Sequence, residues 1–359
     1  MFRFILKRIA YGFLVLLGVV TVVFFLFNVL PGDPAKMMLG QRSDISSTNA
    51  IRQELGLDKP LIVQFGTYLN DISPISIHST DNKSFNYLDS AKYSAVKLLH
   101  FGTKAIVLKK PFLRRSYQSK RQVSDILAEA FPKTALLAII AIIFAIIVGI
   151  IIGILCALYK NSWFDRISLV ISVFGMSLPS FFAAIVLAWI FAFLLSDFTG
   201  LNMFGSLYTV SDFGDGEYLD LKNIILPAIT LGIRPLAIVV ELTRSSVLEV
   251  LSQDYVRTAY AKGLPQAKVI MKHVVKNALN PVVTAVSGWL ASLMAGAVFV
   301  EYIFDWKGVG IVIVNALEKY DFPVLMGALL FISVILVFIN IFVDIIYGML
   351  DPRIRLSKD

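Results

Sequence analysis

The chain has 359 residues, of which 57% are hydrophobic and only 16% are charged. Soluble globular chains carry about 45–50% apolar and about 25% charged residues, so this composition excludes an ordinary soluble domain and indicates a membrane protein. The net charge of +8 does not point to nucleic acid, because no basic block lies between aromatic residues. The single cysteine, Cys156, lies in an apolar run, which excludes an intrachain disulfide and a cysteine metal cluster.

Six apolar stretches are long enough to cross a bilayer, whose hydrocarbon core of about 30 Å needs about 20 helical residues. The first follows Lys7 and Arg8 as a signal peptide would, but its apolar run is too long and has no A-x-A cleavage site. We therefore expect a retained helix and an all-α polytopic membrane protein. The predicted spans are residues 9–30, 134–158, 169–195, 223–243, 282–300 and 324–349.

The orientation follows from the loops, because short cytoplasmic loops carry an excess of Lys and Arg. The loop 244–281 contains six basic and two acidic residues, whereas the loop 197–222 contains five acidic residues and one lysine. We therefore expect both termini in the cytoplasm. The predicted division is a cytoplasmic N-terminus with the first helix (1–30), an external loop (31–133), a five-helix core containing the loop 244–281 (134–349), and a cytoplasmic tail (350–359).

The long external loop is expected to fold in part. Residues 91–99 have a helix-like apolar pattern, and residues 105–108 could form a short strand.

The most informative segment of the chain is residues 254–265, in the basic loop 244–281. Gly263 suits the left-handed position after a helix, and Pro265 suits the first turn of a second helix. Val256, Ala259 and Tyr260 share one face by their i, i+3, i+4 spacing. Eight helical residues span about 12 Å, so a short rod with an exposed apolar side suits a groove on a partner protein. The alternative is a basic amphipathic helix that rests on anionic lipid.

This segment resembles the "EAA" coupling loop of binding-protein-dependent ABC permeases, in the variant of the dipeptide/oligopeptide/nickel family. That variant reads D-Y-V-R-T-A-x-A-K-G-L, followed by H…NAL.P. The matching residues here are Asp254 to Leu264, His273, Asn277, Ala278, Leu279 and Pro281. Further stretches similar to the family are Gly32-Asp33-Pro34-Ala35, Leu226-Pro227-Ala228, Thr243-Arg244-Ser245-Ser246 and Asp351-Pro352-Arg353-Ile354-Arg355.

Arg257-Thr258-Ala259 replaces the glutamate of the EAA motif, as in this subfamily. The chain departs from the family pattern at two places. Glu241 stands where an arginine is more usual. Residues 72–111 look like an insertion into the first external loop, which puts in doubt any external docking surface carried over from the family.

The resemblance implies a type I ABC importer permease fold in the inner, or cytoplasmic, membrane. It implies a heterodimer with a homologous sister permease, two cytoplasmic ATP-binding subunits and an external solute-binding protein. The implied cargo is peptide-like solutes such as dipeptides and oligopeptides, with nickel chelates or another small solute as the alternative. The residues that the resemblance assigns to coupling with the ATPase are Asp254, Tyr255, Arg257, Thr258, Ala259, Tyr260, Ala261, Lys262, Gly263 and Leu264.

The sequence itself indicates a transport subunit without enzyme activity or cofactors. It contains no G-x-x-x-x-G-K-[ST] loop, so ATP must be hydrolysed by a partner. An ion-driven secondary transporter would be expected to show internal repeats with broken helices, and a membrane-embedded hydrolase would need a clustered base and nucleophile. Neither is evident. His78, His100 and His273 are scattered and have no metal-ligand spacing.

Ionisable and kink-forming residues inside the predicted spans are candidate pathway residues. Arg234 lies 11 residues after Asn223, about 16 Å along a helix and therefore near mid-membrane. It either faces the translocation cavity and meets a solute carboxylate, or pairs with a carboxylate on another helix. Pro179 is expected to kink the third span, either beside the pathway or as a packing bend.

A polar stripe in the last span is expected to be structural. Asn340, Asp344 and Tyr347 are spaced i, i+4, i+7 and would hold helices together by hydrogen bonds.

Overall fold

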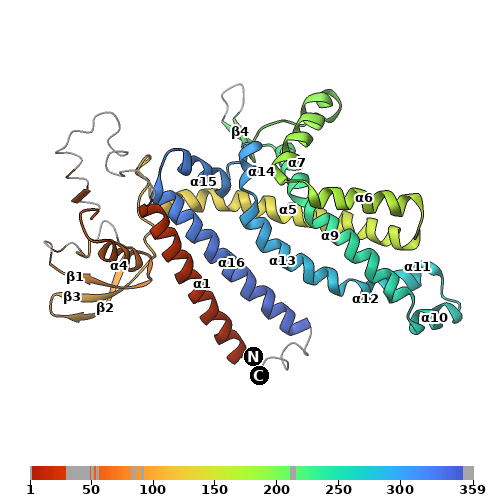
Figure 1. Cartoon of the computed structure of the whole chain (residues 1–359), viewed down its shortest axis with the longest axis horizontal. Helices are drawn as coiled ribbons and strands as arrows, with labels where there is room; N and C mark the ends of the chain where they lie inside the picture. Colours follow the sequence, from red (N-terminus) through yellow and green to blue (C-terminus); the bar gives the residue numbers. More distant parts are fainter. Residues whose placement is uncertain are drawn as a thin grey trace. The chain divides into compact units, whose positions relative to one another are not determined.

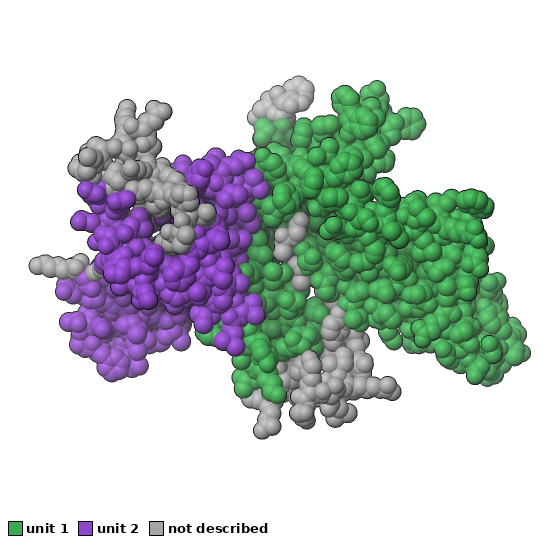
Figure 2. All heavy atoms as spheres, in the orientation of Figure 1, with its two compact units in different colours: residues 1–13, 130–311, 332–359 green, residues 14–129, 312–331 purple. Residues whose placement is uncertain are grey.

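The structure is a computed structural model that describes residues 2–29, 49, 52–53, 56–81, 84, 86–89, 93–210 and 216–350. The family-like stretches Gly32-Asp33-Pro34-Ala35 and Asp351-Pro352-Arg353-Ile354-Arg355 lie outside these residues. The chain forms two compact units (Figure 2). Unit 1 comprises residues 1–13, 130–311 and 332–359, and unit 2 comprises residues 14–129 and 312–331.

Four long apolar helices agree with four of the predicted spans. They are α1 (Phe2–Val29), α5 (Val123–Leu158), α9 (Ile225–Leu251) and α16 (Phe322–Leu350) (Figure 1). Each contains a stretch long and apolar enough to cross a membrane. α9 follows a short 3-10 turn, η3 (Leu221–Ile224), in which the Lys222 backbone N–H donates to the Asp220 carboxylate.

The third predicted span, residues 169–195, is bent at Pro179, where a kink was expected. It is a pair of helical segments that meet at an angle of 114° and begin earlier, at Trp163. The Ser162 hydroxyl caps the first segment, and Pro179 precedes the second and holds Leu178 in an extended conformation. The segments are α6 (Trp163–Ser177), then α7 (Ser180–Leu187) continued by the π-helical η2 (Ala188–Leu194), with α8 (Ser196–Thr199) after them.

The fifth predicted span, residues 282–300, is divided between α13 (Asn280–Gly296) and α14 (Val298–Ile303). The 17 residues of α13 extend about 26 Å at 1.5 Å per residue, slightly less than the hydrocarbon thickness. Within the described residues, four helices meet the length of a span, or five if the bent pair counts as one. The number six therefore stays a prediction.

Short helices connect α9 to α13 and precede α16. Between α9 and α13 lie α10 (Asp254–Ala261), α11 (Gln266–Val269), the π-helical η4 (Ile270–Val275) and α12 (Lys276–Ala278). α15 (Val309–Glu318) precedes α16. In unit 1, α10 and α11 lie beyond the C-terminal end of α9 (Figure 1).

Unit 2 contains a small antiparallel sheet with strand order β1-β3-β2. Residues 105–108 were expected as a strand, and this is confirmed by β3. Residues 91–99 were expected as a helix, and this is wrong from Ala95 onward, because Val96, Leu99 and Phe101 pair with β3 through a turn that has Gly102 at a φ of +56°. The elements are α4 (Leu61–Ile72), β1 (Ile75–Ser79), β2 (Ala95–Phe101) and β3 (Lys104–Lys109). In unit 1, β4 (Tyr208–Val210) pairs with β5 (Glu217–Leu219).

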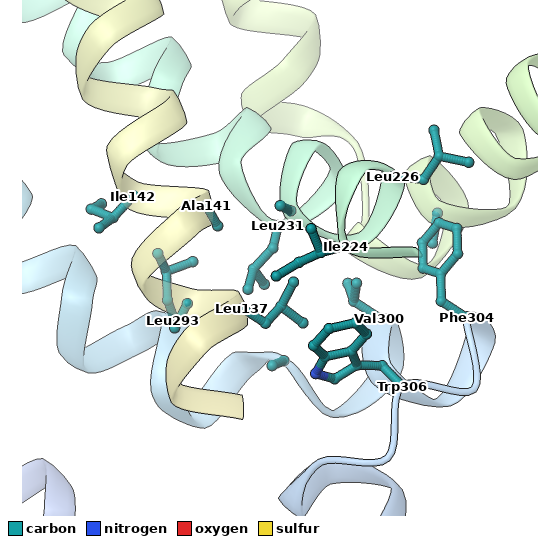
Figure 3. Packing of buried hydrophobic residues seen from close by; sticks show 14 of the residues in the cluster. Leu137, Ala141, Ile142, Ile224, Leu226, Leu231, Leu293, Val300, Phe304 and Trp306 are labelled. Atoms are coloured by element: carbon teal, nitrogen blue, oxygen red, sulfur yellow. The ribbon is translucent and has the colours of Figure 1, made fainter. Parts of the chain in front are cut away.

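The core of unit 1 is formed where α5, α9, α13 and α14 meet (Figure 3). Leu137 and Ala141 from α5 pack with Leu231 from α9, Leu293 from α13 and Trp306 from the segment after α14. The Trp306 ring is fully buried, and its Nε1 donates a hydrogen bond to the carbonyl oxygen of residue 133 at 3.1 Å. This core holds the N-terminal half of α9 against α5, α13 and α14.

Glycines allow α5 and α9 to approach closely. A Cβ at Gly149 would lie 2.7 Å from the Val239 side chain, and one at Gly153 would lie 2.6 Å from the Thr243 side chain. Small residues at helix interfaces are the usual way in which membrane helices pack without a hydrophobic driving force. Larger residues at either position would separate the two helices.

A buried carboxylate holds the segment that follows α14. Glu301 is fully buried and accepts hydrogen bonds from the Thr134 hydroxyl at 2.6 Å and from the Gly310 backbone N–H at 2.7 Å. A Cβ at Gly310 would lie 2.8 Å from the same carboxylate. The carboxylate therefore joins Thr134 of α5 to the beginning of α15 within unit 1.

Candidate coupling and translocation sites

The apolar side of α10 is buried inside this chain. Val256 is 0% exposed and Ala259 is 6% exposed, and both pack in a cluster with Val247 of α9 and Val274 of η4. The expectation that Val256 and Ala259 present an apolar side to a partner is therefore wrong. The side chain of Tyr260, which was assigned to the same face, does remain accessible, with 42% of its surface exposed.

The outer surface of α10 is aromatic and polar. Tyr255 is 43% exposed, and its hydroxyl oxygen accepts a hydrogen bond from the Asn277 Nδ2 at 3.1 Å. Asn277 also donates to the His273 carbonyl oxygen, so two residues of the family-like motif orient Tyr255. On the exposed side of the helix, Arg257 lies 3.5 Å from the Asp254 carboxylate. The remaining exposed positions are Thr258, Ala261, Lys262 and Gly263.

The end of α10 is fixed by backbone geometry. The Gly263 N–H bonds to the Tyr260 carbonyl oxygen and the Leu264 N–H bonds to the Ala259 carbonyl oxygen, which together make a Schellman motif. Gly263 has a φ of +73°, as the sequence predicts. Leu264 packs against the buried cluster, as expected for the residue after such a glycine. Pro265 is the N-cap of α11, one position before the first turn in which it was expected.

The helix that carries α10 is anchored by an ion pair that the sequence analysis missed. Arg244 Nε and Nη2 lie 2.6 Å and 2.8 Å from the two carboxylate oxygens of Asp165, whose side chain is only 2% exposed. The Asn161 backbone N–H donates to the same carboxylate, and the Ser162 hydroxyl caps the Asp165 N–H. The available signal was Ser162-x-x-Asp165 before an apolar run, a pattern typical of a helix N-terminus.

Arg234 and the break at Pro179 converge on one cavity. The cavity has a volume of about 60 Å³ and is lined by Arg234 and by Leu178 and Ser180, the two neighbours of Pro179. Arg234 is exposed, and within the described residues no carboxylate forms an ion pair with it. Trp289 and Ser292 from α13 complete part of the wall.

Asp344 joins two helices of unit 1. Its carboxylate lies 3.0 Å from the Arg8 guanidinium, so α16 and α1 are linked by an ion pair and not by the stripe with Asn340 and Tyr347 alone. Asn340 is exposed, and the side chain of Tyr347 lies outside the described residues. A Cβ at Gly12 of α1 would lie 2.7 Å from Val337 of α16, which shows how closely the helices approach.

The histidines do not come together. His78 lies in β1, His100 in β2 and His273 in η4. Among the residues that the structure describes, no group of three His, Cys, Asp or Glu side chains is arranged to hold a metal ion.

Comparison with known proteins assigns the family. The family described as "binding-protein-dependent transport system inner membrane component" matches residues 149–356, and the N-terminal family of such components matches residues 1–83. The dipeptide transport system permease protein DppB of Alkalihalophilus pseudofirmus is 35% identical over 99% of this chain and 100% of that protein. The glutathione transport system permease protein GsiC of Escherichia coli K12 is 33% identical over 99% of both chains.

A solved structure shares the fold. A chain of the MetNI methionine ABC transporter in inward facing conformations covers 63% of this chain and 96% of its own length, with a TM-score of 0.50 and 13% identity. Permeases of this family carry no ATPase site of their own, because the ATPase is on separate subunits. The chain therefore belongs to the family of binding-protein-dependent transport system inner membrane components, and is a multi-pass permease subunit of an ABC importer of type I fold that works with ATP-binding subunits.

Proposed function

We propose that this permease passes peptide-like solutes, dipeptides or short oligopeptides, across the cytoplasmic membrane. It acts as one half of a heterodimer with a homologous permease, with two cytoplasmic ATP-binding subunits and an external solute-binding protein. Both termini lie in the cytoplasm, and the external loop 31–133 carries an inserted subdomain at residues 72–111. Two relatives named for a dipeptide and for glutathione, itself a tripeptide, support this cargo over a nickel chelate.

The observation that carries the coupling assignment is the way in which α10 packs on the rest of the chain. Its buried side packs on α9 through Val256 and Val247. Its exposed side presents Tyr255 and Tyr260, and its C-terminal end is fixed by the hydrogen bonds described above. A force applied to the exposed side is passed to α9 because the two helices share a packed core. α10 is therefore the element through which the ATP-binding subunits drive the permease.

Gly263 provides the test of this assignment. In Gly263→Val the helix end must change, because a β-branched residue at a φ of +73° is strained by about 1–2 kcal/mol. We expect membrane insertion and subunit assembly to persist, while peptide uptake falls and ATP hydrolysis no longer responds to loaded binding protein. The matched control is Gly102→Val, since Gly102 also has a positive φ and open space where a Cβ would be added. It lies in the turn between β2 and β3 of unit 2. Undiminished uptake in Gly263→Val would contradict the assignment.

Arg234 is the candidate for binding the solute carboxylate. It lines the cavity at the α6–α7 break, and in the described part of the chain it has no carboxylate partner. In Arg234→Gln we expect uptake of a dipeptide to fall while uptake of the same dipeptide amide is unchanged, both measured at saturating binding protein. Arg234→Lys should keep part of the dipeptide uptake. Equal losses for the acid and the amide would show that Arg234 acts in packing only.

A further inference from the structure

The sheet of unit 2 has two sides of opposite character. On one side Ser76, His78, Ala105, Val107 and Lys109 are buried, in keeping with the alternation of side chains along a strand. α4 is fastened to this side, because Lys109 Nζ donates to the Asp71 carbonyl oxygen and the Ile77 N–H donates to Asn70 Oδ1. Figure 1 shows α4 against the strands.

The other side of the sheet is an open apolar surface. The strand register aligns two rows of three aliphatic residues, which we call the aliphatic face: Ile75, Leu108 and Val96 in one row, and Ile77, Ile106 and Leu99 in the other. Five of the six are exposed by 47% to 66%, and Ile106 is half-buried, so no described residue covers this side. Soluble surfaces rarely expose contiguous apolar patches of this kind unless they bind something.

The segment that contains β2 and β3 is strongly positive. Residues 95–124 contain eight Lys and Arg and no Asp or Glu. Lys104 begins β3 and Lys110 follows it, and both are exposed and alternate onto the same side of the sheet as Ile106 and Leu108. Apolar side chains surrounded by lysines match a bilayer surface, where the apolar groups enter the acyl boundary and the lysines meet anionic headgroups.

The sheet is also tied to a membrane-spanning helix. Phe24 and Phe25, within the last turns of α1, contact Phe65 of α4 at ring centroid distances of 5.1 Å and 5.5 Å. Phe24 also stacks on Tyr68 at 5.6 Å. Because α4 is fastened to the sheet, these contacts hold the sheet beside the C-terminal part of α1.

We propose that the aliphatic face rests on the lipid bilayer and that the surrounding lysines bind anionic headgroups. The subdomain then acts as a second membrane anchor beside α1. This inference concerns lipid and does not depend on the identity of the cargo.

Spin labelling of the full complex tests this proposal. Leu99→Cys in a Cys156→Ala background, active in peptide uptake, is labelled with a nitroxide and placed in nanodiscs of phosphatidylglycerol and phosphatidylcholine. Collision with oxygen and with a water-soluble nickel chelate is measured by power saturation. The matched control is Asp81→Cys. Asp81 is exposed and lines a second cavity together with Thr67 and Asn70 of α4.

We expect the Leu99 label to collide several-fold less with the nickel chelate than the Asp81 label, and more with oxygen. In pure phosphatidylcholine, or with Lys104→Gln and Lys110→Gln, this protection should decrease. Equal chelate collision at both positions in anionic nanodiscs would overturn the proposal. Protection that appears only when solute-binding protein is added would also overturn it, in favour of a protein docking surface. Protection that is unchanged by lipid charge and by the lysine substitutions would overturn the role of the headgroups.

Discussion

Of two apolar faces in this permease, one is buried within the chain and the other is exposed. On α10, Val256 and Ala259 are buried by α9 and η4 of the same chain. On the sheet of unit 2, the aliphatic face that includes Leu99 and Val96 is left exposed. Both faces have the regular spacing of an amphipathic element, so the spacing shows that a face must be covered but not what covers it. The difference lies in the neighbours, because α10 packs on α9 and η4 of its own chain, whereas among the described residues an element packs on one side of the sheet only.

The largest expected effect is on the free energy of unfolding when an aspartate is placed on each of the two faces. In Val256→Asp a charge enters a fully buried position without a partner, which should lower the free energy of unfolding by about 3–5 kcal/mol. In Leu99→Asp the same carboxylate enters an exposed position, so the change should stay within about 0.5 kcal/mol. The measurement is thermal unfolding of both variants in detergent. Similar losses in both would mean that the aliphatic face is covered within the chain.

A smaller, qualitative effect tests which side of α10 meets a partner. With cysteine at Tyr260, cross-linking in intact cells should capture an ATP-binding subunit, because 42% of that side chain is accessible. With cysteine at Ala259, one residue away and only 6% exposed, capture should be absent or weak. Cross-linking from Ala259 but not from Tyr260 would contradict the orientation of α10 given above.

The smallest effect concerns the buried side of the sheet. Burial lowers the pKa of His78 below its usual value, and the nearby Lys109 lowers it further. The folded sheet therefore holds His78 neutral, whereas the unfolded chain takes up a proton below about pH 6.5, so stability is lost as the pH falls through this value. Other groups facing the ring are Asp71, Asn70, Ser76 and Tyr93.

Limited proteolysis of residues 75–109 at pH 7.5 and pH 5.5 measures this pH effect. Cleavage of the unmodified chain should increase at the lower pH, and His78→Gln should reduce the difference between the two. His100→Gln, on the exposed edge strand β2, should leave the difference unchanged. A pH effect that survives in His78→Gln would assign it to another group.

Much of the helical framework follows from apolar length alone, as α1, α5, α9 and α16 show. The failures arise where tertiary contacts decide the outcome. Residues 95–99 look helical by their apolar spacing, but β3 offers them hydrogen-bond partners and they form a strand. Pro179 predicts a bend, but its size of 114° depends on what packs around α6 and α7.

The candidate sites show the same division between local and long-range information. The positive φ of Gly263 could be predicted, because it reflects a backbone requirement of one residue. The burial of Val256 and the pairing of Asp165 with Arg244 could not, since each depends on residues from distant parts of the chain. A backbone requirement of one residue can be predicted from the sequence, whereas the partner of a buried side chain can be identified only from the fold.

The continuous helix α9 has a mechanical consequence. Its 27 residues extend about 40 Å, so a tilt of about 5° about one end would displace the other by about 3.5 Å. Arg234 lies in the first half of this rod and α10 follows its last turn. On the coupling proposed above, a displacement of α10 by this amount would therefore tilt α9 and move the part of it that carries Arg234.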